Sequence, residues 1–552
     1  MEKLRETALA YVLQNAVFYK GKASPGAVLG KLLAANPDLR SDVPALKKLI
    51  EEIAAEVNSM SPEEQEKALE KKNPKMLRKE VKKREGLPEI KSAVKGKFVT
   101  RFAPSPTGPL NLGQLLRAAM LPYLYAKKYD GTFILRIEDT DPKNIGSVFY
   151  DMIKEDLMRT GIKWDKLVLE SDSMDVYYRH AEELVKQGKA YVCTCPADEF
   201  RKLKAGKKEC PCRNDDSLSR WKDMLSGKYG EGEAIVRFKT SMSHRNPAMR
   251  DPPMLRVAKG SHPVKGDKYH VWPLYNFACA IEDHYLGVTH VFRGKEHEHN
   301  TSVQKLFYDT FAWKMPEVVN FGMVYLPGTK IHTRDMKQWI DEGKVSGWDD
   351  TRLPTVRALL RRGFQPEAFR MFAEDVGITK NDIRVGWENI EGINRKLIDS
   401  KAGRYMAVLE PQRISITGAP AIREAEEQLH PDFPERGKKK MPVDFDEVYV
   451  SGDDFRHFSG KTVRLKGLGN IVLGKKASYA GNDIVQKMPK LQWVSKPHAR
   501  LTLLTADGEK EGLCEPAMLK INEGSIIQLE RIGFGRIDAV EKKHITVCFA
   551  HK

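Results

Sequence analysis

Apolar positions in the first 70 residues follow a helical spacing. In the segments 4–19 and 43–57 they recur three and four residues apart, which places them on one face of an α-helix. The segment 61–72 begins with Ser61 and carries Glu64 three residues later, a combination typical of a capped helix start. The sequence therefore predicts an N-terminal helical region.

From residue 97 the pattern changes to alternating strands and helices. The segments 97–104 and 131–139 have the composition of strands, and the apolar run 115–130 between them has that of a helix. Further helical segments follow, and the strand-like stretch 269–294 then resumes the alternation. This arrangement is typical of an α/β fold with a parallel sheet.

The C-terminal part of the chain has a third pattern. Residues 345–400 are mostly helical and basic, and after about residue 405 short alternating runs are separated by Gly and Asp turns. Such runs are typical of β-barrels. The sequence as a whole predicts a multidomain α/β + β protein, with three to five domains in its 552 residues.

Charge and cysteine content narrow the class of protein. The net charge of +17 and the pI near 9.2 favour a protein that binds nucleic acid. The alternative is a basic surface whose charge only aids solubility. The basic run 71–86 is either a solvated linker or a contact to phosphates.

No apolar run reaches the roughly 18 residues of a membrane span. Seven cysteines, four of them clustered, indicate a reducing cytoplasm rather than a disulfide framework.

The loop 103–114 has the features of a ligand-binding turn after a strand. Its prolines stiffen it, while Gly108 and Gly113 allow the backbone to approach a ligand closely. Asn111 and Gln114 are expected to open a helix, whose N-terminus favours phosphate. From these residues alone, an ordinary connection between strand and helix remains an alternative.

Two C-x-C pairs lie close together in the segment 190–215, which interrupts the α/β alternation as an insertion would. Cys193 with Cys195 and Cys210 with Cys212 supply four thiolates at a spacing that can close a tetrahedral zinc site. A chance cluster of buried cysteines is the alternative.

Four segments together resemble the glutamyl-tRNA synthetases, a class I family of aminoacyl-tRNA synthetases. They are RFAPSPTGPLNLGQ at 101–114, ILRIEDTDP at 134–142, YNFACAIEDHYLGVTHVFRGKEH at 275–297 and SGWDDTRLPTVRALLRRG at 346–363. They occur in the order and spacing of the family, and the C-terminal β-rich region is similar to the archaeal and eukaryotic type.

The resemblance implies a division into five regions. They are a helical region with a basic linker at 1–95, a Rossmann-like catalytic core at 96–190 and 270–340, an inserted zinc-containing acceptor-stem-binding domain at 191–269, a helical stem-contact domain at 341–404, and anticodon-binding β-barrels at 405–552.

Both signature motifs of the class depart from the usual sequence. Asn111–Gln114 stands in place of the HIGH tetrapeptide that contacts ATP, with Gly113 kept and both histidines replaced by amides. Amides can donate a hydrogen bond to phosphate but carry no charge. The KMSKS loop is matched by residues 330–334, where Lys330 is kept and Arg334 stands near the lost second lysine. The resemblance implies that Gly108, Gly113 and Lys330 contact the nucleotide.

The amino-acid pocket is implied by the matched positions of the family. Arg101 and Arg293 would bind carboxylates, Glu138 would accept the α-ammonium group, and Tyr275 would supply a phenol. Ala103, Ser105 and Arg293 follow the glutamyl pattern rather than the glutaminyl one. A glutamine amide facing Arg293 would leave a buried cation unpaired, at a cost on the order of several kcal/mol.

These expectations combine into a cytoplasmic glutamate–tRNA ligase that uses ATP with Mg²⁺ and holds a structural Zn²⁺. Its partners would be L-glutamate and tRNA(Glu), with tRNA(Gln) as a further candidate, and we expect a monomer without membrane contact. Two alternatives remain. One is a glutaminyl-tRNA ligase, and the other is a catalytically silent tRNA-binding paralogue, which would explain the altered HIGH and KMSKS motifs.

Overall fold

The computed structural model describes residues 1–552 apart from 1, 20, 36–41, 74–75, 77–85 and 329–331. The chain forms two compact units, Met1–Glu85 and Gly86–Lys552. None of the described helices is both long enough and apolar enough to cross a bilayer. Lys330 and most of the basic run 71–86 lie outside the described residues.

The N-terminal unit is helical, as the apolar spacing predicts. Its helices are α1 Glu2–Phe18, α2 Pro25–Ala35, α3 Val43–Asn58 and α4 Pro62–Lys72. Leu13, Ile50 and Leu69 come from three of these helices and are buried in one core. The Ser61 side chain accepts from the N–H of Glu64, and the Glu64 carboxylate accepts from the N–H of Ser61, which confirms the predicted capped start of α4.

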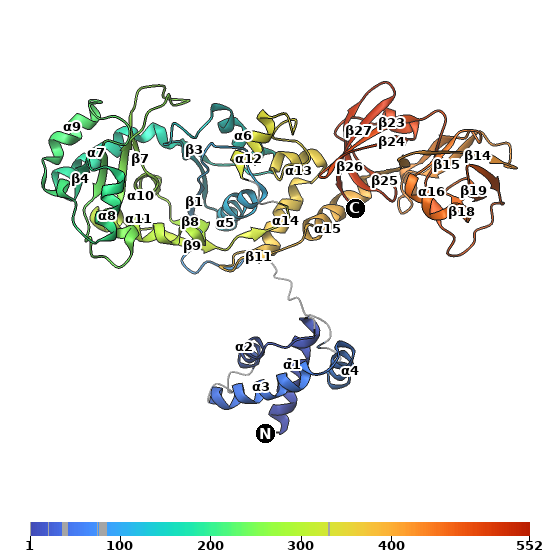
Figure 1. Ribbon diagram of the computed structural model, residues 1–552, viewed down its shortest axis with the longest axis horizontal. Coiled ribbons are helices and arrows are strands. Elements are labelled where there is room, and N and C mark those ends of the chain that lie inside the picture. The colour runs from blue at the N-terminus through green and yellow to red at the C-terminus, as the bar shows by residue number, and fades with distance from the viewer. Residues whose placement is uncertain (1, 20, 36–41, 74–75, 77–85, 329–331) are drawn as a thin grey trace. The chain divides into compact units, whose positions relative to one another are not determined.

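Parallel strands form the centre of the second unit (Figure 1). One sheet has the order β1-β2-β3, and β8 pairs in parallel with β9. β8 lies beside β1, where the Thr289 N–H donates to the Val99 carbonyl at 2.9 Å. The bounds are β1 Val99–Phe102, β2 Thr132–Ile137, β3 Lys166–Leu169, β8 His290–Gly294 and β9 Glu317–Phe321. The predicted α/β fold of this region is confirmed.

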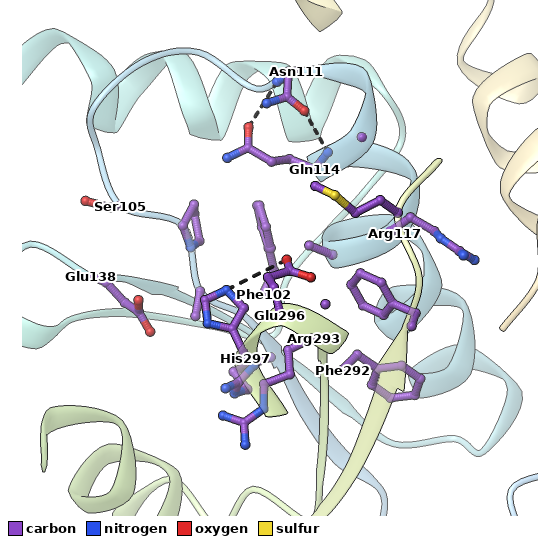
Figure 2. A pocket seen from close by; sticks show the side chains of 18 of the residues that line it. Phe102, Ser105, Asn111, Gln114, Arg117, Glu138, Phe292, Arg293, Glu296 and His297 are labelled. Atoms are coloured by element: carbon purple, nitrogen blue, oxygen red, sulfur yellow. Dashed lines mark hydrogen bonds and ion pairs between the residues drawn. The ribbon is translucent and has the colours of Figure 1, made fainter. Parts of the chain in front are cut away.

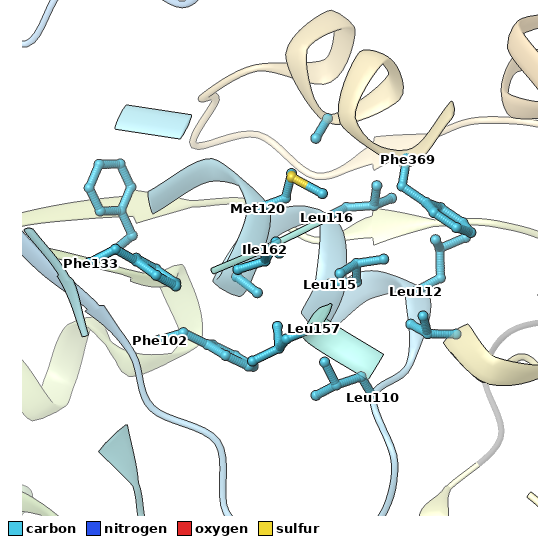
Figure 3. Packing of buried hydrophobic residues seen from close by; sticks show 14 of the residues in the cluster. Phe102, Leu110, Leu112, Leu115, Leu116, Met120, Phe133, Leu157, Ile162 and Phe369 are labelled. Carbon is cyan, nitrogen blue, oxygen red and sulfur yellow. The ribbon is translucent and has the colours of Figure 1, made fainter. Parts of the chain in front are cut away.

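The helix that follows β1 is unusual in its first half. It begins at Leu112, and its segment Gln114–Met120 is π-helical before α5, Leu121–Lys128, continues. Such π-helical turns are rare and frequent at functional sites. Figure 3 shows its apolar side packed against Phe369 of α14, Pro366–Val376. Because Leu110 and Leu112 are both buried in this core, Asn111 between them is held in place.

An antiparallel sheet of order β4-β5-β6-β7 occupies the insertion between β3 and β8. Its strands are β4 Ala190–Cys193, β5 Ile235–Phe238, β6 Pro253–Val257 and β7 Val271–Pro273. The expectation that 269–294 is strand-like throughout is wrong, because helix α10, Tyr275–Tyr285, separates β7 from β8. A short apolar run does not distinguish a buried helix from a strand by periodicity.

Helices surround these sheets and connect them to the C-terminal region. Their bounds are α6 Ser147–Arg159, α7 Met174–Lys186, α8 Ala197–Ala205, α9 Ser217–Leu225, α11 Glu298–Thr310, α12 Thr333–Asp341, α13 Val356–Arg362 and α15 Trp387–Ile398. The short strands β10 Val324–Tyr325 and β11 Ile383–Arg384 pair in parallel. Arg361 of α13 forms an ion pair with Asp538 at 2.7 Å, so this helix is attached to the C-terminal sheets.

Two barrel-like sheets of seven strands make up the C-terminal region, each with its own core. The first has the order β12-β25-β26-β27-β23-β24-β13 and the second the order β21-β18-β19-β20-β14-β17-β22. The bounds for the first are Gly403–Tyr405, Ile526–Leu529, Gly533–Val540, His544–His551, Ala499–Thr505, Gly508–Cys514 and Ala407–Leu409. Those for the second are Lys490–Leu491, Thr462–Leu465, Gly469–Val472, Lys476–Tyr479, Gln412–Thr417, Val448–Val450 and Val494–Ser495. The division into five regions stays a prediction.

Candidate active site

A cavity of about 420 Å³ lies where strands β1, β2 and β8 end (Figure 2). Ligands of open α/β sheets bind at this edge. Residues that the sequence predicts for the site line the cavity together, namely Arg101, Ala103, Ser105, Asn111, Gly113, Gln114, Glu138, Tyr275 and Arg293. The structure therefore brings together side chains that lie almost 200 positions apart in the sequence.

Asn111 and Gln114 form a reciprocal cap at the start of the helix. Oδ1 of Asn111 accepts from the N–H of Gln114 at 2.9 Å, and Oε1 of Gln114 accepts from the N–H of Asn111 at 3.1 Å. This is the geometry of a capping box. Because both amide oxygens are engaged, each side chain has its NH₂ group left for a ligand. In Figure 2 the pair lies on one side of the cavity and Arg293 on the other.

Arg101 is neutralised by a buried carboxylate. Its Nε and Nη2 donate to Asp283 of α10 at 3.0 and 3.4 Å, and Arg136 of β2 donates to the same carboxylate at 2.6 Å. Arg136 also donates to Glu138 at 2.9 Å. Burial alone would raise the pKa of Asp283, but the two guanidinium groups outweigh it and hold this pKa below its usual range. Asp283 thus fixes Arg101 directly and Glu138 through Arg136.

Arg293 differs from Arg101 in having no acidic partner among the residues that the structure describes. It is only 5 % exposed, and its guanidinium donates to Gln304 and Thr301, both neutral. No carboxylate within the described parts of the chain lies at ion-pair distance from it, and its Nε is buried without a hydrogen-bond partner. An uncompensated buried cation is costly, so the site is prepared for an anionic ligand.

Three groups around Glu138 are held in their uncharged forms. Burial raises the pKa of Tyr275, and it raises the pKa of Cys279 well above the usual thiol range. The Cys279 thiol donates to Glu138 at 3.3 Å. Burial also lowers the pKa of His297, which lines the same cavity directly before the first residue of α11. Glu138 offers a carboxylate in this wall, with only 16 % of its side chain exposed, and Glu296 beside His297 is a second carboxylate that lines the cavity.

Other predicted residues are not brought to the cavity. Gly108 does not line it; a Cβ added there would lie 2.4 Å from Cγ2 of Thr333, so this glycine allows the start of α12 to lie close to the 103–114 loop. The side chain of Arg334 is 91 % exposed and pairs only loosely with Asp335 at 3.8 Å. Lys330 lies outside the described residues.

The four clustered cysteines meet around one point. The Sγ atoms of Cys195 and Cys210 lie 3.5 Å apart, those of Cys193 and Cys210 3.6 Å, and those of Cys195 and Cys212 3.6 Å. A tetrahedron with Zn–S bonds of about 2.3 Å has edges of about 3.8 Å, close to these separations. None of the four forms a disulfide. The geometry fits a tetrahedral metal ion.

Sequence reasoning missed the buried charges in and behind the wall of the cavity. Arg136 and Asp283 are described above, and Arg117 is buried in the π-helical turn, where it donates to the carbonyls of Gly322 and Gly377. The available signal was a charged residue inside an otherwise apolar element, as with Arg136 in ILRIE and Asp283 in FACAIED. Such residues are rarely buried unless they are paired.

The comparisons with known proteins agree with this geometry. The catalytic domain of the class I tRNA synthetases (E and Q) matches residues 97–400, and two models of the anticodon-binding domain of the same group match residues 402–490 and 489–538. The glutamate–tRNA ligase of Pyrococcus furiosus is 45 % identical, and that of Thermococcus kodakarensis is 44 % identical. The glutamate–tRNA ligase of Methanocaldococcus jannaschii is 42 % identical. Each alignment covers all of this chain and all of its relative. The chain therefore belongs to the class I aminoacyl-tRNA synthetases of the glutamyl and glutaminyl family.

Proposed function

We propose that this protein is a glutamate–tRNA ligase. The α-carboxylate of glutamate attacks the α-phosphate of ATP, giving glutamyl-adenylate and pyrophosphate, and a terminal ribose hydroxyl of tRNA(Glu) then attacks the mixed anhydride and releases AMP. The observation that carries the substrate assignment is Arg293, a buried cation without an acidic partner in the described structure, in the same cavity as the Glu138 carboxylate. Full-length relatives named for this activity support it.

The amino acid fits the charged end of the cavity. Arg293 would pair with the side-chain carboxylate of glutamate, and Glu138 would accept the α-ammonium group. Arg101 and Tyr275 would hold the remaining polar atoms, while Ala103 and Ser105 leave room beside them. Glutamine would place a neutral amide against Arg293, and this favours glutamate over glutamine.

The nucleotide fits the end formed by the start of the helix. Gly113 permits close approach, and the NH₂ groups of Asn111 and Gln114 would donate to ATP. Lys330, and Arg334 in the first turn of α12, would reach the phosphates, and Gly108 would assist by letting Thr333 of that helix approach closely. Class I synthetases use ATP with Mg²⁺, which neutralises phosphate charge when bound. The protein's part is positioning and charge stabilisation rather than acid–base chemistry.

The tRNA would contact several regions of the chain. The net charge of +17 provides the electrostatic attraction for a polyanion. The C-terminal sheets, matched by anticodon-binding models, would read unpaired anticodon bases, and the insertion 191–269 would contact the acceptor stem. Besides tRNA(Glu), tRNA(Gln) is a further candidate substrate, and aminoacylation assays with each purified tRNA distinguish the two.

A structural zinc ion would be held by Cys193, Cys195, Cys210 and Cys212. The sulfur separations, the absence of disulfides among these cysteines and their position in the insertion support this assignment. Unpaired thiols also fit a cytoplasmic protein. We further propose that the chain acts as a monomer.

Aminoacylation with purified protein tests the proposal. Radiolabelled glutamate should be transferred to tRNA(Glu) in the presence of ATP and Mg²⁺, and glutamine should not. Transfer of glutamine in preference to glutamate would make the protein a glutaminyl enzyme. Failure to charge any tRNA, with tRNA binding retained, would identify the silent paralogue.

A further inference from the structure

Gln304 of α11 holds the guanidinium of Arg293 without neutralising it. Oε1 of Gln304 accepts from Nη1 of Arg293 at 2.9 Å, and Thr301, one turn earlier on the same helix, accepts from Nη2. These two bonds use two of the guanidinium's five N–H donors. Both acceptors are neutral, so the orientation of Arg293 is fixed while its charge stays available.

A row of amides fixes the orientation of Gln304 in turn. Nε2 of Gln304 donates to Asn276 at 3.3 Å, and Asn276 donates to Asn300 at 3.1 Å. Asn300 lies 3.1 Å from Nδ1 of His297, whose pKa is lowered by burial. The row that runs from Arg293 to the cavity wall therefore contains only neutral side chains, namely Gln304, Asn276, Asn300 and His297. The amide of Gln304 must present its oxygen to Arg293, because its nitrogen is engaged on the other side.

Arg101, the other buried arginine of the site, has an acidic partner, so the neutral surroundings are particular to Arg293. Arg101 is equally buried, at 4 % exposed, but pairs through two N–H groups with Asp283. Arg136 completes that cluster through Asp283, Glu138 and Glu170. Two guanidinium groups lie there against three carboxylates, whereas no carboxylate of the described residues lies at ion-pair distance from Arg293.

We propose that Gln304 determines specificity through its neutrality: it accepts from Arg293 without supplying a counter-charge, which keeps the charge of Arg293 for a ligand carboxylate and thereby excludes the neutral amide analogue. The inference rests on the proposed function and adds to it the element that sets the choice between glutamate and glutamine. A carboxylate at position 304 would occupy nearly the same volume as the amide and would supply the counter-charge that the substrate otherwise provides.

Gln304→Glu tests this role, with Gln304→Met as a second variant that removes the hydrogen bond but adds no charge. Gln187→Glu, at an exposed turn after α7, is the matched control. The KM and kcat values for glutamate, glutamine and ATP are measured by tRNA-dependent pyrophosphate exchange, and folding is checked by thermal unfolding. We expect Gln304→Glu to raise the glutamate KM by tenfold or more, with the ATP KM within twofold of wild type.

The preference for glutamate over glutamine is the deciding quantity. It should fall at least tenfold in Gln304→Glu and stay within threefold of wild type in Gln304→Met and Gln187→Glu. An unchanged preference in folded Gln304→Glu would overturn the inference, as would equal losses of preference in the glutamate and methionine variants. If Gln304→Glu does not fold, a tenfold loss of preference in Gln304→Met overturns the inference and a retained preference supports it. A wild-type protein that activates neither amino acid would instead refute the proposed function.

Discussion

Asn111 and Gln114 cap each other's backbone at the edge of the cavity, with oxygen-to-nitrogen distances of 2.9 and 3.1 Å. The two amides that replace histidines of the HIGH motif are therefore fixed by local hydrogen bonds rather than by a ligand. Their oxygens stabilise the start of the helix, and their NH₂ groups are left to donate. Substitutions can therefore separate the role of the amide oxygen in helix capping from that of the NH₂ group in ligand binding.

Asn111→Ala and Asn111→Ser separate capping from donation. Asn111→Ala should lower the free energy of unfolding by about 1 kcal/mol, because it removes the cap, and should raise the ATP KM several-fold. Asn111→Ser keeps an acceptor oxygen, so it should retain wild-type stability while the ATP KM rises as in the alanine variant. Chemical unfolding and pyrophosphate exchange measure the two effects. A serine variant with a wild-type ATP KM would show that the amide does not contact the nucleotide.

Arg293→Met should remove glutamate recognition while leaving nucleotide binding in place. The buried cation would be lost, so we expect a rise in the glutamate KM on the order of 100-fold, equivalent to about 2.7 kcal/mol. The ATP KM should stay within threefold. Arg159→Met, on the exposed side of α6, is the matched control and should leave the glutamate KM unchanged. Wild-type glutamate kinetics in Arg293→Met would remove this residue from the pocket.

Asp283→Asn should be strongly destabilising, because it leaves Arg101 and Arg136 buried without their shared carboxylate. Breaking a buried ion pair in this way costs about 3–5 kcal/mol of unfolding free energy. Asp198→Asn breaks an exposed pair with Arg201 and should cost less than about 1 kcal/mol. Guanidinium unfolding compares the three proteins. Similar stability of Asp283→Asn and Asp198→Asn would contradict the charge network.

The same carboxylate predicts a pH dependence. The pKa of Asp283 is lowered in the folded protein, so the folded state binds fewer protons than the unfolded state near the pKa of an unfolded aspartate, about 3.9. Its contribution is present above that pH and is lost as the pH falls through the lowered pKa. Stability measured between about pH 5 and pH 2 should therefore decline less steeply in Asp283→Asn than in wild type. Parallel curves would be inconsistent with a depressed pKa.

Metal analysis of freshly purified protein should find about one zinc ion per chain. Cys195→Ser should abolish stoichiometric binding, since one of four thiolates is lost, and should lower the thermal stability of the insertion. Cys279→Ser is the control, because Cys279 lies at Glu138 and not in the cluster. Metal-free wild-type protein that keeps full stability in chelator would refute the zinc assignment.

The sequence motifs predict which strand ends form the site, but not how its charges are balanced. Arg101, Glu138, Tyr275 and Arg293 could be named because they stand in recognisable segments, and all four line the cavity. The pairing of Arg136 with Asp283 joins residues 147 positions apart, and only the packing of α10 against the sheet brings them together.

Local conformation was also only partly predictable. The apolar run after Asn111 predicts a helix, but no residue in it signals the π-helical turn Gln114–Met120. The segment 275–285 has the short apolar composition of a buried strand, and its helical form depends on contacts with α11 and β6. We infer that tertiary packing determines the conformation of the π-helical turn that carries Arg117 and of helix α10, which carries Asp283.

Pyrophosphate exchange with glutamate and with glutamine, in the presence of the matching tRNA, tests the central claim most directly. We expect exchange with glutamate that depends on tRNA(Glu), and at least 100-fold less with glutamine, because only glutamate supplies a carboxylate for Arg293. Equal or faster exchange with glutamine would contradict a cavity built around that unpaired cation.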